Sequence, residues 1–295
     1  MTTTESLKRK INSIQDLYTV VKTMKALAAV SIRQYEKALE SLTDYNRTVE
    51  MGLQIVLRQQ YFSGKVSFPL SASGEKARSQ SRLGAIIFGS DRGLCGQFNE
   101  QIASHGLAYL KQSTKPVIAV VGSRVVYSIE AAGYAIDAQF SLANSAVGIT
   151  EKVQQVLLKI EQWEQQQIER IVLLYNQTTS NASYRPVSFQ LLPLDLNWLS
   201  SLQRKQWSSS TIPTFTMDEN QLFSALIRQY IFVSLYRAFA FSLASENASR
   251  LASMQSAQKN IEERLGDLNA QYRRDRQTSI TAELLDVVGG FEALS

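Results

Sequence analysis

A regular stripe of apolar residues runs along the first sixty positions of the chain. From Glu5 to Gln60 the sequence has no proline, and apolar residues recur in alternating steps of three and four. With Lys25 and Asn46 as its only polar members, the stripe is Leu7, Ile11, Ile14, Tyr18, Val21, Lys25, Ala28, Ile32, Tyr35, Leu39, Leu42, Asn46, Val49, Leu53 and Val56. This 3.5-residue repeat is typical of a coiled-coil seam and predicts one very long helix. Thr2 and Glu5 have capping-box spacing for its start.

A second long helix is predicted near the other end of the chain. Thr216 and Glu219 have capping-box spacing, and no proline occurs from there to Gly289. The first part of this helix is apolar almost all round. The second part narrows to a stripe at Leu251, Met254, Gln258, Ile261, Leu265, Leu268 and Tyr272. Small residues between the two parts permit close approach of a neighbouring element.

The predicted lengths of these helices indicate their arrangement. At about 1.5 Å per residue each helix would run roughly 80 to 105 Å. A compact chain of this length would be only about 50 Å across. We therefore expect the helices to pair antiparallel as a protruding rod; the alternative is that bends break each helix into a bundle.

Between the two helices, short apolar runs alternate with helical segments. Residues 63–82 are rich in serine and are typical of a linker. Strands are predicted at Leu83–Phe88, Pro116–Val121, Ile171–Tyr175 and Ser188–Leu192, and helices near Asn99–Lys111, Ser123–Ala132 and Val153–Gln166. The alternation predicts an α/β fold with a small, mostly parallel sheet and flanking helices, joined to the long antiparallel coiled coil. The predicted segments are 1–62 (helix), 63–82 (linker), 83–196 (Rossmann-like domain), 197–217 (connection) and 218–295 (helix).

The glycine-rich loop from Gly89 to Gly96 follows the first predicted strand, where many α/β sheets bind nucleotides. The phosphate loop needs G-x-x-x-x-G-K-[ST], but Leu94 stands where the second glycine is required. Only the second half of the dinucleotide pattern G-x-G-x-x-G is present, at Gly93 and Gly96. The sequence therefore argues against a nucleotide site and predicts no cofactor.

Side chains that could perform chemistry are few. Cys95 is the only cysteine and His105 the only histidine. A disulfide or a typical zinc site would therefore lack residues, and His105 is the one histidine that a catalytic triad could use. We expect a chain without catalytic activity. Asp91 and Arg92 in the glycine-rich loop have two interpretations: they fix the loop by hydrogen bonds, or they hold a neighbouring subunit.

The charge balance keeps one alternative open. The chain carries 31 basic and 26 acidic residues, a net charge of +5, and such an excess favours an acidic partner without choosing among partners. The cluster Arg273, Arg274 and Arg276 permits a coiled-coil adaptor or a nucleic-acid-binding protein. Nearby carboxylates dilute this cluster, and the aromatic residues of known nucleic-acid modules are missing. No apolar run reaches the length of a membrane span.

Four separated motifs occur in order along the chain. They are Lys8-Arg9-Lys10-Ile11 with Lys22-x-Met24, the loop Ser90-Asp91-Arg92-Gly93-Leu94-Cys95-Gly96, the run from Leu243 to Met254, and Arg276-Gln277-Thr278-Ser279-Ile280-Thr281-x-Glu283-Leu284. Together they resemble the gamma subunit of F-type ATP synthases. The resemblance covers both ends and the middle of the chain.

This resemblance implies a rotary shaft without catalytic activity, cofactor or small-molecule substrate. The coiled coil would lie inside a ring of three alpha and three beta subunits. The α/β domain would stand on the membrane c-ring beside a small epsilon-type stalk subunit. Rotation driven by ion flow would bias each nucleotide site in turn, and hydrolysis would reverse it. The implied location is the cytoplasmic face of a membrane, as a peripheral part of the complex, and no nucleic acid is implied as a partner.

The resemblance also implies roles for single residues. Met24 and Lys25 match positions where the first helix meets lever loops of the beta subunits. Arg250, Gln277 and Thr281 match positions that make polar contacts with loops of the ring. For Met24 the alternative is seam packing, and for Arg250 it is a solvated helix face. The complete implied partner-binding set is Met24, Lys25, Asp91, Arg92, Arg250, Arg276, Gln277, Thr281 and Glu283.

The sequence departs from the family pattern at several places. Gln97 and Phe98 follow Gly96 where another glycine and an apolar residue are usual, and Ser31 stands where a lysine is usual. These departures indicate a divergent branch, of the alternate type that some bacteria carry beside their main synthase.

Overall fold

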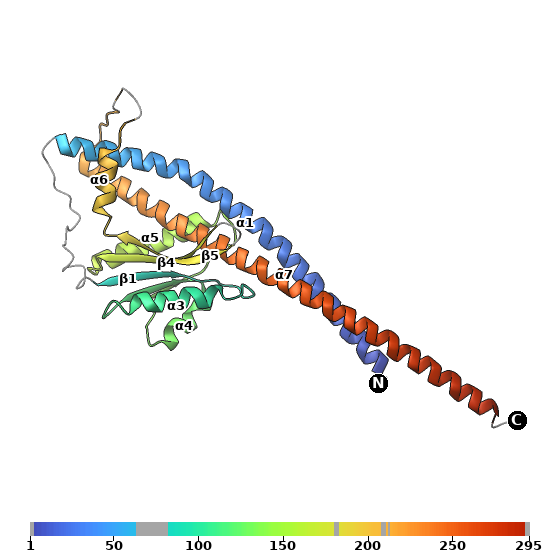
Figure 1. Ribbon diagram of the computed structural model, residues 1–295. Coiled ribbons are helices and arrows are strands. Elements are labelled where there is room, and N and C mark those ends of the chain that lie inside the picture. The colour runs from blue at the N-terminus through green and yellow to red at the C-terminus, as the bar shows by residue number, and fades with distance from the viewer. Residues whose placement is uncertain (1–2, 63–81, 180–182, 208–210, 212, 293–295) are drawn as a thin grey trace. The chain divides into compact units, whose positions relative to one another are not determined.

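Two long helices dominate the computed structural model, which describes residues 3–62, 82–179, 183–207, 211 and 213–292 (Figure 1). They are α1 (Thr3–Phe62) and α7 (Glu219–Glu292). Both predicted helices are confirmed, and their ends lie within a few residues of the prediction. Thr2 of the first predicted capping box lies outside the described residues. So does the predicted linker, apart from residue 82.

The chain divides into two compact units. The first combines Met1–Ala29 with Arg250–Ser295, and the second comprises Val30–Ser249. Each long helix therefore contributes one part to each unit. The five segments predicted from the sequence divide the chain at other positions than these two units, and that division stays a prediction.

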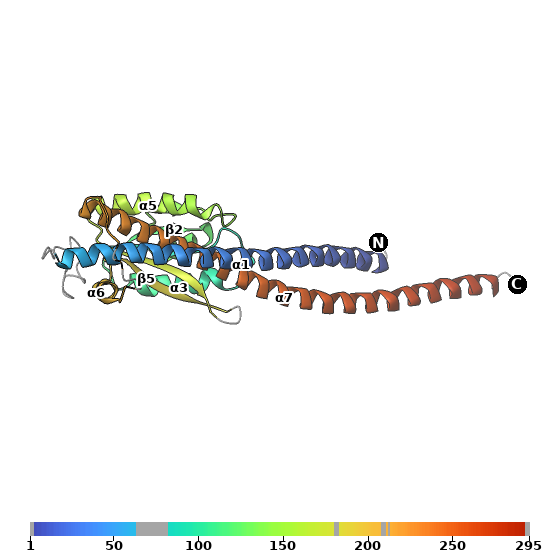
Figure 2. The same ribbon diagram turned by 90° about the horizontal axis from the view of Figure 1, so that it is seen from above.

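In the first unit, α1 and α7 lie side by side and antiparallel. The Tyr18 hydroxyl donates to Glu262 Oε1 (2.9 Å), and Lys25 Nζ donates to Gln258 Oε1 (3.0 Å). Every predicted seam residue in these two stretches is buried or half-buried. The most deeply buried are Leu7, Ala28, Met254 and Leu268. In both views α7 continues past the N-terminal end of α1 (Figures 1 and 2).

The start of α7 differs from the prediction. The carboxylate of Asp218 accepts hydrogen bonds from the backbone N–H groups of Asn220 (3.0 Å) and Gln221 (3.1 Å). Asp218 is thus the N-cap, directly before the helix, which is where a capping side chain reaches these donors. The predicted capping box of Thr216 and Glu219 is wrong, because Thr216 lies two residues too early.

The second unit is built around a five-stranded sheet with the order β3-β2-β1-β4-β5. Its strands are β1 (Leu83–Phe88), β2 (Val117–Val121), β3 (Ala138–Phe140), β4 (Arg170–Thr178) and β5 (Tyr184–Leu192). Strands β1 to β4 are parallel, whereas β5 pairs antiparallel with β4 at one edge. The prediction of a small, mostly parallel sheet is confirmed.

Helices cover both faces of the sheet (Figure 1). The shorter helical elements are α3 (Phe98–Leu110), the 3-10 turn η1 (Ser123–Val125), α4 (Val126–Ala131), α5 (Ile149–Gln165) and α6 (Leu196–Arg204). One face packs against α3 and α4 through Ala85 and Ile87, and the other packs against α5 and α7. Phe88 meets Phe239 of α7 edge-on, with ring centroids 5.0 Å apart. The neighbouring Ala238 and Ala240 are fully buried in the same core.

In the second unit α1 also lies against α7. A Cβ added at Gly52 would come within 2.8 Å of Leu226, and the Tyr45 hydroxyl donates to Gln229 (2.8 Å). Every predicted seam residue of α1 in this unit is buried or half-buried. Antiparallel pairing of the terminal helices is therefore found within each unit.

Two elements were not predicted from the sequence. Strand β3 has three residues, too few to show an alternating pattern. Helix α6 occupies the stretch expected to be a connection. It is capped by Asp195, whose carboxylate accepts from the Asn197 N–H (2.9 Å), and it buries Leu199 and Leu202. A helix of nine residues with two buried positions gives little periodic signal in the sequence. Tertiary packing therefore determines that this segment is helical.

Candidate partner interface

The loop after β1 is held by the chain's own side chains. The Asp91 carboxylate accepts from the backbone N–H groups of Ser123 (2.9 Å) and Leu142 (2.7 Å). These donors follow β2 and β3, so one carboxylate ties together three strand ends. Ser90 N–H donates to Asn99 Oδ1 (2.9 Å), and Asn99 Nδ2 donates back to the Ser90 hydroxyl (2.9 Å). For Asp91 this geometry supports the loop-fixing interpretation.

Backbone geometry in the same region requires glycine at two positions. Gly96 has φ +56° and Gly122 has φ +94°. A Cβ added at Gly122 would lie 2.8 Å from the Ser90 nitrogen, so the loops after β1 and β2 could not approach each other as they do. Leu94 adopts φ +62° without being glycine, and its side chain is exposed. An exposed leucine on a strained backbone is a surface that a partner could cover.

The crevice in which α/β sheets usually bind ligands is closed in this chain. It lies beyond the carboxyl ends of β1 and β4, where successive connections change face. There Asn176 Nδ2 donates to the Phe98 carbonyl (3.2 Å), and Ser245 of α7 donates to the Asn176 carbonyl (3.0 Å). Ser249 of α7 donates to the Cys95 carbonyl (2.5 Å). Helix α7 thus occupies the place where a nucleotide would sit.

The other side chains that could take part in chemistry, Arg92, Cys95 and His105, lie in surroundings typical of structural residues. Arg92 is exposed and donates to Asn144 Oδ1 (3.3 Å). Cys95 is a buried thiol. His105 lies 2.8 Å from the Ser188 hydroxyl, and partial burial lowers its pKa. Within the described part of the chain, no group of three or more histidine, cysteine, aspartate or glutamate side chains could hold a metal ion. Nor is any described helix long and apolar enough to cross a membrane.

Met24 and Lys25 lie on α1 in the first unit, and both are half-buried. Lys25 and Gln258 form part of a polar cluster, since Gln258 Nε2 also donates to Glu262 Oε1 (2.9 Å) and to the Tyr18 hydroxyl (3.3 Å). The hydrogen bond to Glu262 raises the pKa of Tyr18, and hydrogen bonds from Gln258 and Tyr18 lower the pKa of Glu262. Lys25 is therefore a polar seam residue that bonds across the helix pair.

Asn46, the other polar member of the seam, bonds within its own helix. Its Nδ2 donates to Glu50 Oε1 (2.7 Å), four residues further along α1. Among the residues that the structure describes, it forms no hydrogen bond across the pair.

The predicted residues of α7 fall into two groups. Arg250 is only 8% exposed, so a solvated face is the wrong interpretation of this residue. Arg276, Gln277, Thr281 and Glu283 are all exposed. The Thr281 hydroxyl donates to the Gln277 carbonyl (2.9 Å) in the same helix. Their contacts with partner chains stay predictions.

Exposed apolar residues mark two further surfaces, both in the first unit, that sequence reasoning did not single out. Helix α1 exposes Leu17, Val20 and Leu27 outside its seam, and the end of α7 exposes Ile280, Leu284, Leu285, Val287 and Val288. In α1 the sequence could have indicated this surface, because these apolar residues lie outside the predicted seam. Isolated exposed leucines need no explanation, but rows of them on both helices indicate a covered surface.

Comparisons with known proteins agree with this picture. A family model described as ATP synthase matches residues 3–294. A protein of Desulforamulus reducens, the ATP synthase gamma chain, is 26% identical over 294 residues and matches along the whole length of both chains.

Solved structures with a similar fold include two rotor parts. In the rotor of the mitochondrial ATP synthase of Euglena gracilis, one chain is 16% identical, with a TM-score of 0.58 over 94% of this chain and 99% of that one. In the central stalk and c-ring of the Tetrahymena thermophila mitochondrial enzyme, one chain is 20% identical, with a TM-score of 0.55 over 81% of this chain and 99% of that one. Sequence motifs, fold and the match along nearly the whole chain agree, and the chain belongs to the ATP synthase gamma family.

Proposed function

We propose that this chain is the central-stalk shaft of a rotary ATP synthase and carries no chemistry of its own. The single observation that carries the proposal is the end of α7. Residues 276–289 are helical and exposed throughout, and they include five large apolar side chains. A helix of this kind is stable in water only when a partner buries its apolar face. A ring of alpha and beta subunits would supply that partner.

The proposal assigns the residues of the first unit to contacts with the ring. Met24 and Lys25 would meet the lever loops of the beta subunits as they pass. Arg250, Gln277 and Thr281 would make polar contacts with ring loops, and Arg276 and Glu283 lie beside them on α7. The exposed row of Leu17, Val20 and Leu27 supports a surrounding partner on the α1 side as well.

The proposal assigns the second unit to the foot of the stalk. Arg92 and the exposed Leu94 would face the small epsilon-type subunit or the c-ring, while Asp91 keeps the loop in shape. The location would be the cytoplasmic face of the membrane, as a peripheral part of the complex. The solved structures with a similar fold, which are a rotor and a central stalk with its c-ring, support this assignment.

Co-purification tests the proposal directly. An affinity tag placed beside Val147, which is 89% exposed, would be used to recover the chain from gently solubilised membranes. We expect ATPase activity and two larger subunits, each in threefold molar excess. Recovery of the chain with other proteins and without ATPase activity would refute the shaft and restore the adaptor alternative.

A truncation and a point variant test the assigned roles. Removal of residues 276–295 should weaken retention in the ring but leave the circular dichroism of the second unit unchanged. Met24→Lys should lower ion pumping per ATP hydrolysed in the assembled complex, because it places a cation against passing loops. Met24→Leu conserves volume and should retain normal coupling. Unchanged coupling in Met24→Lys would remove Met24 from the interface.

A further inference from the structure

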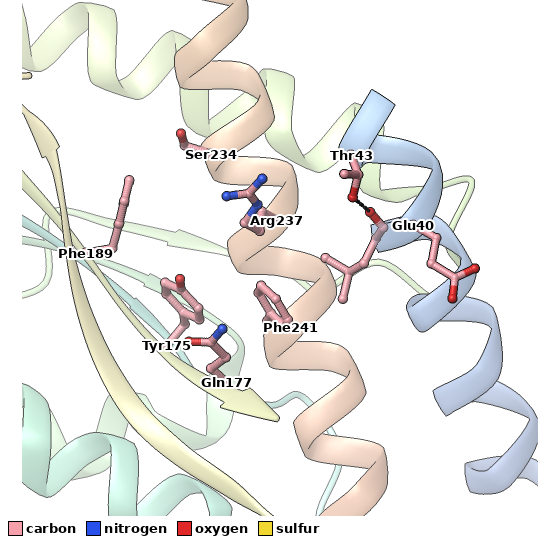
Figure 3. Close-up of a pocket in the computed structure, with 9 residues that line it drawn as sticks. Glu40, Thr43, Tyr175, Gln177, Phe189, Ser234, Arg237 and Phe241 are labelled. Atoms are coloured by element: carbon pink, nitrogen blue, oxygen red, sulfur yellow. Dashed lines mark hydrogen bonds between the residues drawn. The ribbon is translucent and has the colours of Figure 1, made fainter. Parts of the chain in front are cut away.

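A cavity of about 390 Å³ lies in the second unit, among α1, α7 and the edge of the sheet formed by β4 and β5 (Figure 3). Cavities of this size accommodate small organic molecules. It is lined by Leu39, Glu40, Thr43, Tyr175, Gln177, Phe189, Ser234, Arg237 and Phe241. None of these residues belongs to the predicted partner-binding set.

The Arg237 guanidinium lines this cavity and has no anionic partner among the described residues. Among the described residues, no side chain or carbonyl forms an ion pair or hydrogen bond with the Arg237 guanidinium, although the residue is half-buried. Glu40 lines the same cavity, but its carboxylate is directed away from Arg237 (Figure 3). Arg228, nine residues earlier on α7, does pair, with Glu161 (2.9 Å).

Two further donors face the same space. Within the described chain the Tyr175 hydroxyl and the Gln177 side-chain amide make no hydrogen bond, and both come from β4. By contrast, Thr43 donates to the Leu39 carbonyl (3.1 Å), and Ser234 bonds with Tyr230. Arg237 and Tyr175 line the same cavity (Figure 3), where burial raises the pKa of Tyr175 and the charge of Arg237 opposes this rise.

The remaining wall of the cavity is apolar and flat. The rings of Tyr175 and Phe241 stack with an interplanar angle of 11° and centroids 6.3 Å apart. Phe189 and Leu39 add further apolar side chains to the lining. An apolar wall lowers the local dielectric, so a hydrogen bond between Arg237 and an anion is stronger here than on an open surface. A planar group could lie on the aromatic wall while its charged end meets the guanidinium.

We propose that this cavity is a binding site for a small molecule that joins a carboxylate or phosphate group to a planar apolar body. Arg237 binds the anion in a bidentate manner, the Gln177 amide and Tyr175 hydroxyl donate to it, and the wall of Phe241 and Phe189 covers the body. The proposal is for binding, and it assigns no reaction to the residues of the site. The inference does not depend on the proposed shaft function.

Binding of phenyl phosphate to the purified full-length chain tests this site. Titration calorimetry at low ionic strength should give a dissociation constant of about 1 mM or tighter. Phenol, which keeps the ring and lacks the anion, should bind at least about tenfold more weakly, because a charge-assisted hydrogen bond contributes about that factor. Inorganic phosphate, which lacks the ring, should also bind more weakly. Equal binding of phenol would show an apolar patch only and would overturn the proposal.

Matched variants locate the site. Arg237→Gln should weaken phenyl phosphate binding by about tenfold or more, and Arg237→Lys by less, since lysine lacks the bidentate fork. Arg228→Gln removes an arginine of the same helix outside the cavity and should leave binding unchanged. Gln177→Leu gives a second test from the sheet side and should weaken binding. Full affinity in both Arg237→Gln and Gln177→Leu would overturn the proposal.

The assembled complex gives the final test. Phenyl phosphate should still bind when the chain is in its complex, with the same dependence on Arg237. Loss of binding on assembly would show that a partner chain covers the cavity, and this outcome too would overturn a small-molecule site in the complex.

Discussion

Two stretches of the same helix have opposite surroundings. In α7, residues 238–249 are buried by their own unit, except that Phe241 is half-buried. Residues 276–289 of the same helix, in the other unit, are exposed at every position. Both stretches contain large apolar side chains, so hydrophobicity alone does not separate them. The difference is that the first stretch finds its packing partners within this chain, and the second finds none among the described residues.

The comparison teaches how the chain distributes its stability. Burial of an apolar side chain stabilises the fold only if the burying group is present. The second unit therefore carries its own stability. The end of α7 depends on whatever covers it, which in the proposed function is the ring.

The largest expected change in the free energy of unfolding comes from removing a large side chain from the buried stretch of α7. Phe239→Ala removes a fully buried ring that meets Phe88, and it should lower the free energy of unfolding by about 3–5 kcal/mol. The matched change at the exposed end, Leu284→Ala, should alter it by less than about 0.5 kcal/mol in the isolated chain. Denaturant unfolding followed by circular dichroism measures both values. A large loss in Leu284→Ala would mean that this chain, or a second copy of it, covers the tail.

An intermediate effect is expected in the polar part of the seam. Lys25→Met combined with Gln258→Leu replaces a hydrogen-bonded pair by apolar side chains across the helix pair. Polar seam residues fix register at a cost in stability, so the double variant should stabilise the pair by about 1 kcal/mol. Thermal melting of the helical signal tests this, with exposed Gln15→Leu as the control. Destabilisation would show that the polar cluster of Tyr18, Gln258 and Glu262 is worth more than apolar packing.

The smallest expected effect is a dependence on pH in the second unit. Partial burial would raise the pKa of Asp137, but hydrogen bonds from Lys159 (2.8 Å) and Trp163 Nε1 (2.8 Å) lower it below its usual 3.8. A carboxyl whose pKa is lowered by folding stabilises the fold above its unfolded pKa. That contribution is lost as the pH falls through the folded value. Acid should therefore destabilise the second unit, and Asp137→Asn should remove part of this dependence.

A control for the pH prediction lies in the first unit. Glu262 also has a lowered pKa, but it is exposed to solvent, which screens its interactions. Glu262→Gln should therefore change the acid dependence less than Asp137→Asn. Acid titrations of both variants, followed by circular dichroism, compare the two. An equal or larger effect of Glu262→Gln would contradict the ranking.

The elements whose apolar pattern repeats over many turns could be predicted from the sequence. The seams of α1 and α7 extend over many turns, so the stripe specified helix, buried face and pairing. The short elements β3 and α6 could not be predicted, because a few residues carry no measurable period. The N-cap at Asp218 was missed because the capping-box spacing at Thr216 fits the same pattern two residues earlier.

The candidate site could be predicted less completely than the fold. The loop from Ser90 to Gly96 is evident as a motif, but the sequence could not say that Asp91 bonds to Ser123 and Leu142, since those residues follow other strands. The cavity around Arg237 had no sequence signal. Its lining comes from α1, from the adjacent strands β4 and β5, and from α7, which are three regions distant along the chain. An arginine in an apolar helix does not by itself indicate whether a carboxylate is in reach.

The Asp91 carboxylate also makes the shape of its loop independent of any bound ligand. It occupies backbone donors at the strand ends of an α/β sheet, where related architectures receive the phosphate of a ligand. Because this anion is part of the chain, it stays beside its donors without any exchange with free ligand. The loop therefore keeps its shape whatever the concentration of metabolites around it.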